Sequence, residues 1–416
     1  MGRRCSQGYR SELRPLGGTT LNTTIRFGLG LLVVTASSIG ISAASADVVT
    51  DWNIRAADIA VSAKLPTPPT VRGMAIVQTA VYEAVKAAPG ASVEAAVAAA
   101  NRATLSKLFP AQQAAIDSAY QAALSAIAES PAKTEGIGLG EKAAAAVLAL
   151  RMEDGAATAE SYRPRTAAGQ YVPTVVPVGS QWPQRKPWVM TSASQFRPGP
   201  PPSLTSKLWA RDYAEIKAIG AKTSTQRTAE QTEIARFWEA TALTIYYPVV
   251  RSVAALPGRE VTKNARLLAA VAQAMDDAVI AVFDAKYHYN FWRPITAIRN
   301  GDRDGNDATE RDASWTPFID TPMHPEYPCA HCILSAAIGA VLQAEIGTGD
   351  MPTLSTTSPT APGMVRRWTK ISDFTREVAS ARIYDGVHYR NSTEVGSAMG
   401  KRIGELVAAK YLRPGN

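Results

Sequence analysis

Apolar side chains recur at helical spacing through the first third of the chain. Met74, Val77, Val81 and Val85 lie three or four residues apart within alanine-rich sequence. This spacing puts them on one face of a helix, and alanine has the highest helix propensity of all residues. No alternation of apolar and polar residues, which would indicate strands, competes with the pattern. Proline and glycine divide it into predicted helices at 70–88, 91–108, 111–129 and 139–152.

The sequence changes character between residues 155 and 205. This stretch is rich in proline, and its run from Phe196 to Pro202 cannot form a regular helix. We interpret it as a long ordered loop or a linker. Helical spacing returns afterwards and predicts helices at 206–221, 226–245, 260–292, 331–346, 364–388 and 393–411.

These two sets of helices predict an all-α protein. An N-terminal helical region covers residues 47–205, including the proline-rich loop at 155–205, and a C-terminal helical region covers 206–416. The chain has 416 residues and a hydrophobic content of 46%, so it can bury a sizeable core and is not expected to be disordered.

Residues 1–46 have the composition of an export signal. Five arginines accompany an apolar run from Phe27 to Val34, and the segment ends in Ala44-Ser45-Ala46, a small-x-small cleavage pattern. The alternative is an uncleaved membrane anchor, but the apolar stretch is short, and no later segment offers about 18 uninterrupted apolar residues. We therefore expect a cleaved signal peptide, export to the periplasm or the medium, and no stable membrane insertion afterwards.

The net charge of the expected mature chain is small. The whole chain carries +8, and residues 1–46 hold five Arg and one Glu, a balance of +4, which leaves +4. Lys and Arg are dispersed, without a cluster of basic and aromatic residues. Nucleic acid is therefore not an expected partner, whereas a small anionic ligand is compatible with the charge.

Three short segments concentrate basic side chains in a chain with only four histidines; they are 286–294, 324–332 and 381–388. Taken singly, each has an ordinary interpretation, as surface charges at a helix end or as core histidines. Together, the guanidinium groups of Arg293 and Arg382 and the ammonium of Lys286 can neutralise a tetrahedral or trigonal-bipyramidal oxyanion. One histidine can then bond to the central atom while another handles protons.

The second segment also precedes the start of a predicted helix. Pro328, Cys329, Ala330 and His331 come just before the apolar run at 333–346. The first N–H groups of a helix have no partner inside the helix, and the helix dipole makes that end attractive to anions. The helix start is therefore a second contributor to the same oxyanion site.

The order and spacing of these residues resemble the three-part signature shared by vanadium haloperoxidases and type 2 phosphatidic acid phosphatases. The pattern is Lys, six residues, Arg-Pro, then Pro-x-x-His, then Arg, five residues, His. The first segment, which ends in Phe-Trp-Arg293-Pro294, is more similar to the haloperoxidase branch. The resemblance is specific between about residues 283 and 396. It implies two packed helical bundles with the oxyanion site in the C-terminal one.

The resemblance also implies a role for each site residue. His388 would ligate the vanadium of bound vanadate, or act as nucleophile if phosphate occupies the same site. His331 would be the acid/base. His324 lies where the family's chloroperoxidases carry Phe and its algal bromoperoxidases carry His, which favours bromide over chloride. The oxyanion's oxygens would be bound by Lys286, Arg293 and Arg382, with Cys329 and the backbone N–H of Ala330 beside them.

Two positions depart from the family pattern. Cys329 replaces a serine, and Ser392 replaces the Asp commonly found four residues after the last histidine. In the phosphatases that Asp holds the nucleophilic histidine in its tautomer. Its absence therefore argues more against a phosphatase than against a peroxidase, in which His388 need only ligate the metal oxide.

The implied activity is vanadate-dependent oxidation of halide, with bromide favoured, by hydrogen peroxide. An exported acid phosphatase acting on phosphate esters is the first alternative, because phosphate and vanadate share shape and charge. A non-catalytic oxyanion-binding protein is the second.

Cys329 is the residue that the resemblance explains least. A cysteine at a helix N-terminus beside cationic groups is expected to have a lowered pKa and to oxidise readily, which conflicts with peroxide turnover. We therefore expect the active protein either to hold Cys329 and Cys332 as a disulfide or to use the site for phosphate chemistry. A buried reduced pair is the alternative.

Overall fold

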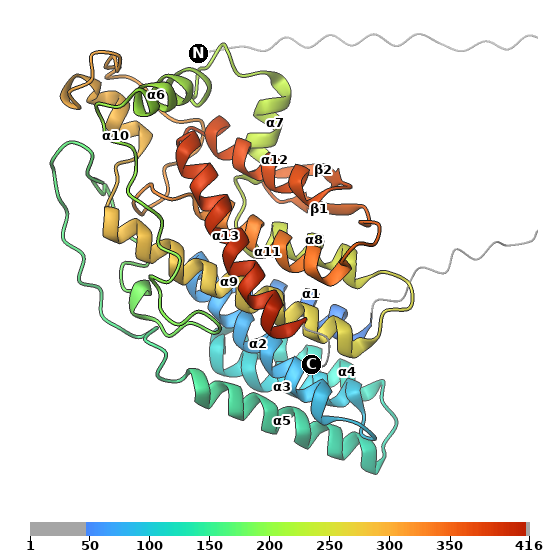
Figure 1. Ribbon diagram of the computed structural model, residues 1–416. Coiled ribbons are helices and arrows are strands. Elements are labelled where there is room, and N and C mark those ends of the chain that lie inside the picture. Colours follow the sequence, from blue (N-terminus) through green and yellow to red (C-terminus); the bar gives the residue numbers. More distant parts are fainter. Residues whose placement is uncertain (1–46, 413–416) are drawn as a thin grey trace, which may run out of the picture. The chain divides into compact units, whose positions relative to one another are not determined.

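Figure 1 shows the computed structural model of the protein, which describes residues 47–412. The predicted signal peptide at 1–46 lies outside the described residues. The described part is all-α, as predicted, with one small two-stranded sheet. Its helices are α1 (Val48–Ser62), α2 (Thr67–Ala87), α3 (Val93–Leu108), α4 (Gln113–Ser125), α5 (Pro131–Arg151), α6 (Lys207–Ile219), α7 (Ala229–Trp238), α8 (Ala242–Ala254), α9 (Val261–Tyr289), α10 (Pro294–Arg299), α11 (Ala330–Ile346), α12 (Ile371–Tyr384) and α13 (Arg390–Tyr411). Short 3-10 helices lie at Pro110–Gln112, Trp182–Gln184 and Gly301–Arg303.

Helix α9 is the central element of the fold. It packs against α2 on one side and against α11 and α13 on the other, so it lies between the blue-to-cyan and the orange-to-red helices of Figure 1. Every residue but one from Asn264 to Lys286 is buried. A helix buried on all sides needs apolar or small residues all round, and the repeated Ala, Val and Leu of α9 supply them. One hydrophobic cluster therefore includes helices from both predicted regions, and the boundary at 205/206 stays a prediction.

The C-terminal end of α9 determines where two site residues lie. Asn290 caps the helix in the left-handed conformation with a φ of 49°, and its N–H donates to the carbonyl of Lys286 at 2.8 Å. Asparagine tolerates this conformation better than most residues. The chain then turns, and Arg293 immediately precedes Pro294, the first residue of α10. Lys286 thus lies in the last turn of one helix and Arg293 at the start of the next.

Helix α13 approaches α11 through three glycines, Gly396, Gly400 and Gly404, spaced four apart. A methyl group at Gly400 would collide with the backbone oxygen of Ile333, and one at Gly404 with that of Ala337. Only a residue without a side chain allows this approach. We call this contact the glycine seam. It holds in place the helix that begins beside the site.

Two helix predictions need correction, and two helices were not predicted. The segment 364–388 is not one helix, because Ala361–Trp368 forms strand β2, antiparallel to β1 (Leu354–Ser358), before α12 begins. The segment 226–245 is divided at residues 239–241, where Thr241 is extended and precedes α8. The helices that were not predicted are α1 and α10.

The proline-rich stretch 155–205 is an ordered loop fastened to α9. The Arg197 guanidinium donates to both carboxylate oxygens of Asp284, at 2.7 Å each. Arg185 donates to both oxygens of Asp276, at 2.6 and 3.0 Å. These ion pairs tie the loop to the same helix that carries Lys286.

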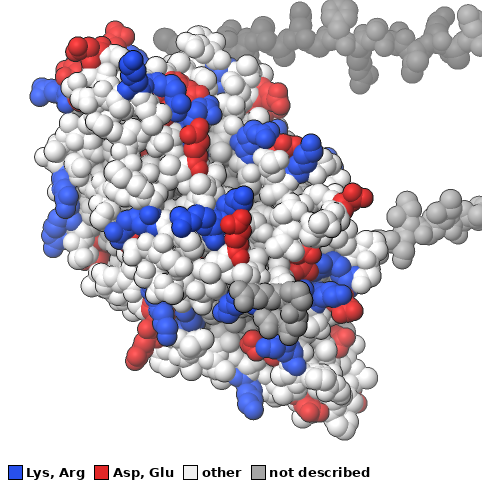
Figure 2. Space-filling model, viewed as in Figure 1, with Lys and Arg blue, Asp and Glu red and all other residues white. Residues whose placement is uncertain are grey.

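Within residues 47–412, no helix is long and apolar enough to cross a membrane. On the face shown in Figure 2, basic and acidic side chains are interspersed among uncharged ones, without a continuous basic surface.

Candidate oxyanion site

The structure brings the three predicted segments together. The side chains of Lys286, Arg293, Arg382 and His388 are all at most 2% exposed. His324 is half-buried, and its Nδ1 lies 2.9 Å from Nη2 of Arg293, whereas Nε2 of His388 lies 3.4 Å from Nη1 of the same arginine. Arg293, in the first segment, therefore contacts one histidine in each of the other two segments.

The Lys286 ammonium is held by two neutral oxygens. It donates to the backbone carbonyls of Pro325 at 3.0 Å and Glu326 at 2.7 Å. Burial lowers the pKa of Lys286 well below its usual value, and the charge of Arg293 acts in the same direction. A bound anion would offset both effects and favour the charged amine.

Arg293 is also held by backbone oxygens. Its Nε donates to the carbonyl of His324 at 2.9 Å, and its Nη1 donates to that of Val387 at 2.8 Å. Burial lowers the pKa of Arg293 to about 10, which still leaves it charged at neutral pH. Because carbonyl oxygens carry no net charge, they fix the orientation of the guanidinium without neutralising it.

Arg382 has one charged neighbour and one unpaired donor. Its Nη1 donates to the carbonyl of Trp238 at 2.9 Å and lies 2.7 Å from Oδ2 of Asp385. Its buried Nε has no hydrogen-bond partner among the described residues. A buried unpaired donor is costly, and an oxyanion within reach would satisfy it.

His388 is oriented by Glu326, a residue that sequence analysis missed. The Glu326 Oε1 lies 2.7 Å from Nδ1 of His388 and accepts the backbone N–H of Tyr389 at 3.1 Å. A carboxylate accepts hydrogen bonds, so the pairing places the histidine proton on Nδ1 and leaves the lone pair on Nε2. Glu326 thus supplies the carboxylate contact to His388 that Ser392 cannot. The presence of Ser392 therefore no longer disfavours a phosphatase.

The start of α11 carries His331. Its Nε2 lies 3.2 Å from the carbonyl oxygen of Ala240, which favours a proton on Nε2 and a free lone pair on Nδ1. Burial and the charge of Arg382 lower the pKa of His331 well below its usual value. The imidazole is therefore neutral at neutral pH and able to accept a proton.

Cys329 is joined to Cys332 in a disulfide at the N-terminus of α11. In this form Cys329 has no S–H to donate to an anion. Its Sγ accepts the backbone N–H of Cys332 at 3.2 Å. The N–H groups of Ala330 and His331, at the first two helical positions, are the ones that point beyond the helix start.

The charge balance of the site suits an oxyanion. Three cationic side chains share the interior with two carboxyl groups, Glu326 and Asp385. Burial raises the pKa of each carboxyl to about 7, although the nearby cations oppose this shift. Both are therefore only partly ionised near neutral pH, and the site carries an excess of positive charge. The donor set, three cations and a histidine whose unprotonated Nε2 faces Arg293, fits vanadate or phosphate.

The site opens into a cavity of about 880 Å³. His324, His331, Arg382 and His388 all line it, together with Ala330. His324 and His331 of the second segment therefore face the same space as Arg382 and His388 of the third segment. Lys286 and Arg293 lie behind it, fully buried.

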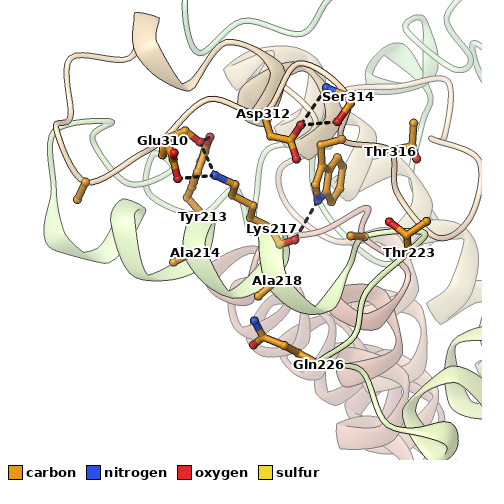
Figure 3. Close-up of a pocket in the computed structure, with 13 residues that line it drawn as sticks. Tyr213, Ala214, Lys217, Ala218, Thr223, Gln226, Glu310, Asp312, Ser314 and Thr316 are labelled. Atoms are coloured by element: carbon orange, nitrogen blue, oxygen red, sulfur yellow. Dashed lines mark hydrogen bonds and ion pairs between the residues drawn. The ribbon is translucent and has the colours of Figure 1, made fainter.

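A second hollow, of about 480 Å³, lies between α6 and the loop at 308–316 (Figure 3). Its charged groups already have partners: Nζ of Lys217 bonds to Glu310, and Oδ1 of Asp312 accepts from Ser314. No histidine lines it. Among the described residues there is also no group of three His, Cys, Asp or Glu side chains that could hold a metal cation.

The two carboxyls of the site had a signal in the sequence. Glu326 and Asp385 are the only acidic residues within the three basic segments. The family pattern places an acid four residues after the last histidine, whereas the acid that contacts His388 lies 62 residues earlier in the chain.

The chain matches a known family model and several solved structures. Residues 266–415 match the family model of the VCPO second helical-bundle domain. No curated protein matches the chain.

Among solved structures, the chain is similar to that of the first bacterial vanadium-dependent iodoperoxidase, with 22% identity and a TM-score of 0.75 over 88% of this chain and 96% of that one. It is also similar to an apo-type bacterial vanadium-dependent chloroperoxidase, with 18% identity and a TM-score of 0.67 over 84% and 95%. The holo-type structure of a bacterial vanadium-dependent chloroperoxidase has 18% identity and a TM-score of 0.65 over 86% of this chain and 93% of that one. The resemblance seen in the sequence is therefore confirmed: the C-terminal part of the chain matches a family model of the VCPO second helical-bundle domain, and the described chain shares its fold with bacterial vanadium-dependent haloperoxidases.

Proposed function

We propose that the protein is a vanadate-dependent haloperoxidase that oxidises halide, with bromide favoured, by hydrogen peroxide. For bromide the balanced reaction is Br⁻ + H₂O₂ + H⁺ → HOBr + H₂O. The observation that carries the proposal is a buried set of three cations, held largely by neutral carbonyls, around a histidine whose unprotonated Nε2 lies 3.4 Å from Nη1 of Arg293. Bound vanadate would supply a Lewis-acidic centre that activates peroxide.

The chain's own residues bind and orient the anion. Lys286, Arg293 and Arg382 would hold its oxygens, since ammonium and guanidinium groups are strong donors to oxyanions. His388 would coordinate the central atom through Nε2. Glu326 keeps that nitrogen unprotonated because its Oε1 accepts a hydrogen bond from Nδ1–H of His388.

His331 would move protons beside the anion. Its neutral state and free Nδ1 allow it to accept a proton from peroxide and to return it when water leaves. An anion bound among the cations would weaken the field that lowers its pKa, so the histidine would become more basic once the site is filled.

Bromide as the preferred halide rests on the family resemblance, in which algal bromoperoxidases carry His at the position of His324. His324 lines the cavity beside the site, and its Nδ1 lies 2.9 Å from Nη2 of Arg293. The structural relatives are named for iodide and for chloride, so their names favour no single halide for this chain.

The pair of Glu326 and His388 favours an acid phosphatase as the second candidate. A histidine nucleophile needs an unprotonated Nε2 and benefits from a carboxylate that accepts a hydrogen bond from Nδ1, and both are present. The disulfide between Cys329 and Cys332 favours the peroxidase, because it leaves no free thiol at the helix start for peroxide to oxidise.

A paired assay tests the proposal. Protein loaded with vanadate and dialysed is assayed for bromide-dependent peroxidation, and vanadate-free protein is assayed on an aryl phosphate. We expect retained vanadium and signal in the first assay only. His388→Ala should lose both the vanadium and the activity, whereas His288→Ala, at an exposed position on α9, should keep them. Signal only with the phosphate ester would establish the second candidate, and signal in neither would favour a non-catalytic oxyanion-binding protein.

Export is also part of the proposal, and it rests on the composition of residues 1–46. Mass spectrometry of the protein recovered from the cell envelope or the medium should give an N-terminus at Asp47. An intact Met1 in membrane fractions would indicate an uncleaved anchor instead.

A further inference from the structure

We propose that a small cavity beside Glu326 is a binding site for one water molecule, and that this water fixes the carboxylate that orients His388. The small cavity is lined by residues of α6, of the start of α13 and of the segment before α11. Among the described residues, none lines both this cavity and the larger one that His388 faces. The water site itself is independent of the proposed function, whereas its effect on vanadate binding rests on it.

Three buried polar atoms around the small cavity have no hydrogen-bond partner among residues 47–412. They are Oε2 of Glu326, Oη of Tyr389 and Oγ of Ser392, and all three residues line the cavity. Each residue is at most 3% exposed. A buried polar group without a partner is costly, so three of them around one space point to a shared partner in that space.

The size of the small cavity suits a single water molecule. The centre of a water-sized molecule has about 10 Å³ of room in it. One buried water needs at least roughly 10–15 Å³ measured in this way, and it needs two to four polar partners. Vanadate and phosphate are larger than water, and the carboxylate of Glu326 would repel them. The rings of Trp209 and Phe291 also line the cavity and separate its polar groups from solvent.

The polar groups of the small cavity match the bonding capacity of water, which donates two hydrogen bonds and accepts two. Glu326 and Asp212 supply carboxylate acceptors, and the hydroxyls of Tyr389 and Ser392 supply donors. Burial and the charge of Glu326 raise the pKa of Tyr389 well above its usual value. Its hydroxyl therefore keeps the proton that it would donate to the water.

Asp212 is held in place by groups other than the water. Its Oδ2 accepts the backbone N–H of Asn391 at 2.7 Å, and its Oδ1 accepts Nε–H of Arg211 at 2.8 Å. A carboxylate has about four lone-pair sites, so it can accept a further hydrogen bond. Asp212 thus provides an acceptor of fixed position at the edge of the small cavity.

The water would hold the oxygen of Glu326 that no described residue holds. Oε1 accepts Nδ1–H of His388 at 2.7 Å and the backbone N–H of Tyr389 at 3.1 Å. A carboxyl group held through one oxygen can still rotate about its terminal bond, because that torsion is broad. A partner on Oε2 fixes the plane of the carboxylate, and with it the direction of the hydrogen bond to His388.

This arrangement gives a role to Ser392, where the family pattern has Asp. Burial raises the pKa of Glu326 to about 7, and the charges of Lys286 and Arg293 and the hydroxyl of Ser392 oppose that rise. The hydroxyl therefore lies close to the carboxyl that contacts His388. Because serine is smaller than aspartate, it leaves space for a water. Ser392 is a positioning residue that acts on His388 through the water and Glu326.

A high-resolution crystal structure of the vanadate-free full chain tests the water site. We expect one density peak within hydrogen-bond distance of Oε2 of Glu326, Oη of Tyr389 and Oγ of Ser392. A direct hydrogen bond from Ser392 to Glu326 with no peak in the small cavity would overturn the site. Crystals grown with rubidium in place of sodium should show no anomalous signal there, because such a signal would make the occupant a cation rather than water.

Two variants and two matched controls test the positioning role. Ser392→Ala and Tyr389→Phe each remove one hydroxyl that the water would accept from. Ser397→Ala is the control for the first, because Ser397 lies on the same helix and donates to the carbonyl of Thr393 at 2.9 Å. Tyr247→Phe is the control for the second, because it removes a buried, unpaired hydroxyl on α8, away from the small cavity.

Nitrogen NMR of the vanadate-free protein gives the readout. In both cavity variants the Nδ1–H of His388 should exchange with solvent at least about threefold faster, and the fraction of imidazole protonated on Nε2 should rise. Both controls should match the parent. Unchanged His388 signals in the cavity variants would overturn the positioning role. A change in Ser392→Ala alone would mean a direct contact with Glu326 and would overturn the shared water.

Vanadate affinity provides an independent measurement. Each cavity variant should raise the vanadate dissociation constant by about threefold, since the water lies one contact beyond the residue that orients His388. If both hydroxyls act through one water, the double variant should be little worse than either single variant, whereas independent effects would multiply to about ninefold and overturn the shared water.

These outcomes are separable from failure of the proposed function. The crystal and NMR measurements use vanadate-free protein and no turnover. If the water and the changes at His388 are found while bromide oxidation is absent, only the proposed function fails. If bromide oxidation is present and the small cavity is dry, only this inference fails.

Discussion

Two clusters of buried charge lie along α9, and they are built differently. In the cluster around Asp276, Arg185 donates to the carboxylates of Asp276 and Asp154, and Arg72 donates to Asp154 as well. In the oxyanion site, Lys286 and Arg293 donate to backbone carbonyls instead. The first cluster neutralises its cations within the protein, whereas the second does not.

The pKa values of the carboxyls show the same difference. Burial acts to raise the pKa of Asp154, but hydrogen bonds from Arg72 and Arg185 outweigh it, and the pKa is lowered. Burial raises the pKa of Glu326 and of Asp385 to about 7. Paired charges stabilise the fold, and cations left without full counter-charge are available to a ligand. Burial and cationic charge therefore do not identify a ligand site unless the acceptors are known.

The largest effect on stability is expected at Asp276. Asp276→Asn leaves Arg185 buried without its bidentate partner, which should lower the free energy of unfolding by about 3–5 kcal/mol. Vanadate affinity of the folded protein should change by less than about twofold. Urea unfolding and vanadate titration measure the two quantities. Asp302→Asn, at an exposed site, should cost less than about 0.5 kcal/mol. A large loss of vanadate affinity in Asp276→Asn would mean that the two clusters are coupled.

Arg382→Lys tests the second cluster, the oxyanion site, for its ability to bind an anion. Lysine keeps the charge but cannot both donate to the carbonyl of Trp238 and direct a second N–H toward an anion in a planar arrangement. We expect the vanadate dissociation constant to rise by about tenfold or more, with stability much less affected. Arg376→Lys, on the exposed face of the same helix, is the control and should bind normally. Normal binding by Arg382→Lys would show that charge alone suffices.

Glu326 should make vanadate binding depend on pH. Its raised pKa means that it is a carboxylate above about pH 7 and a neutral acid below, so its hold on Nδ1 of His388 weakens as the pH falls through about 7. Vanadate retention should therefore decrease by about threefold on the acid side. Glu326→Gln should remove this dependence.

The control for that profile is Asp385→Asn, because the pKa of Asp385 is also raised to about 7, beside Arg382. A profile that persists in Glu326→Gln and disappears in Asp385→Asn would assign it to the second carboxyl.

Among these variants, His324→Phe should have the smallest effect on vanadate affinity. The change removes the contact between Nδ1 and Arg293 but leaves the hydrogen bonds of that arginine to two carbonyls. We expect vanadate affinity within about twofold of the parent and a larger change in the KM for bromide. Vanadium analysis and halide kinetics separate the two, with His288→Phe as control. Loss of vanadium would make His324 a direct ligand-binding residue.

The parts of the site that the sequence predicted share one property: their spacing is local. Lys286 and Arg293 lie seven residues apart around a helix end, and Arg382 and His388 lie six apart. Each pair is fixed by one turn of backbone. The contact between Glu326 and His388 depends instead on how α11, α12 and α13 pack, and local spacing carries no information about it.

The fold, too, was predictable only where local spacing determines the structure. Long helices with apolar spacing, such as α9 and α13, were predicted within a few residues. Strand β2 was not, because its residues alternate weakly in burial and Gly363 takes a φ of 81° that only the hairpin with β1 explains. The division between α7 and α8 also has a tertiary reason, since it brings the carbonyl of Ala240 to His331.

The glycine seam has a consequence for the order in which the site forms during synthesis. Helix α11 carries His331 and is held through Gly400 and Gly404 of α13, which follows every other site residue in the chain. A ribosome-bound chain that ends before α13 would have all the ligand-binding side chains, but it would lack the glycine seam that completes the packing around α11. The anion pocket is therefore a late product of folding, and a nascent chain would not be able to capture vanadate or phosphate until α13 has emerged and docked.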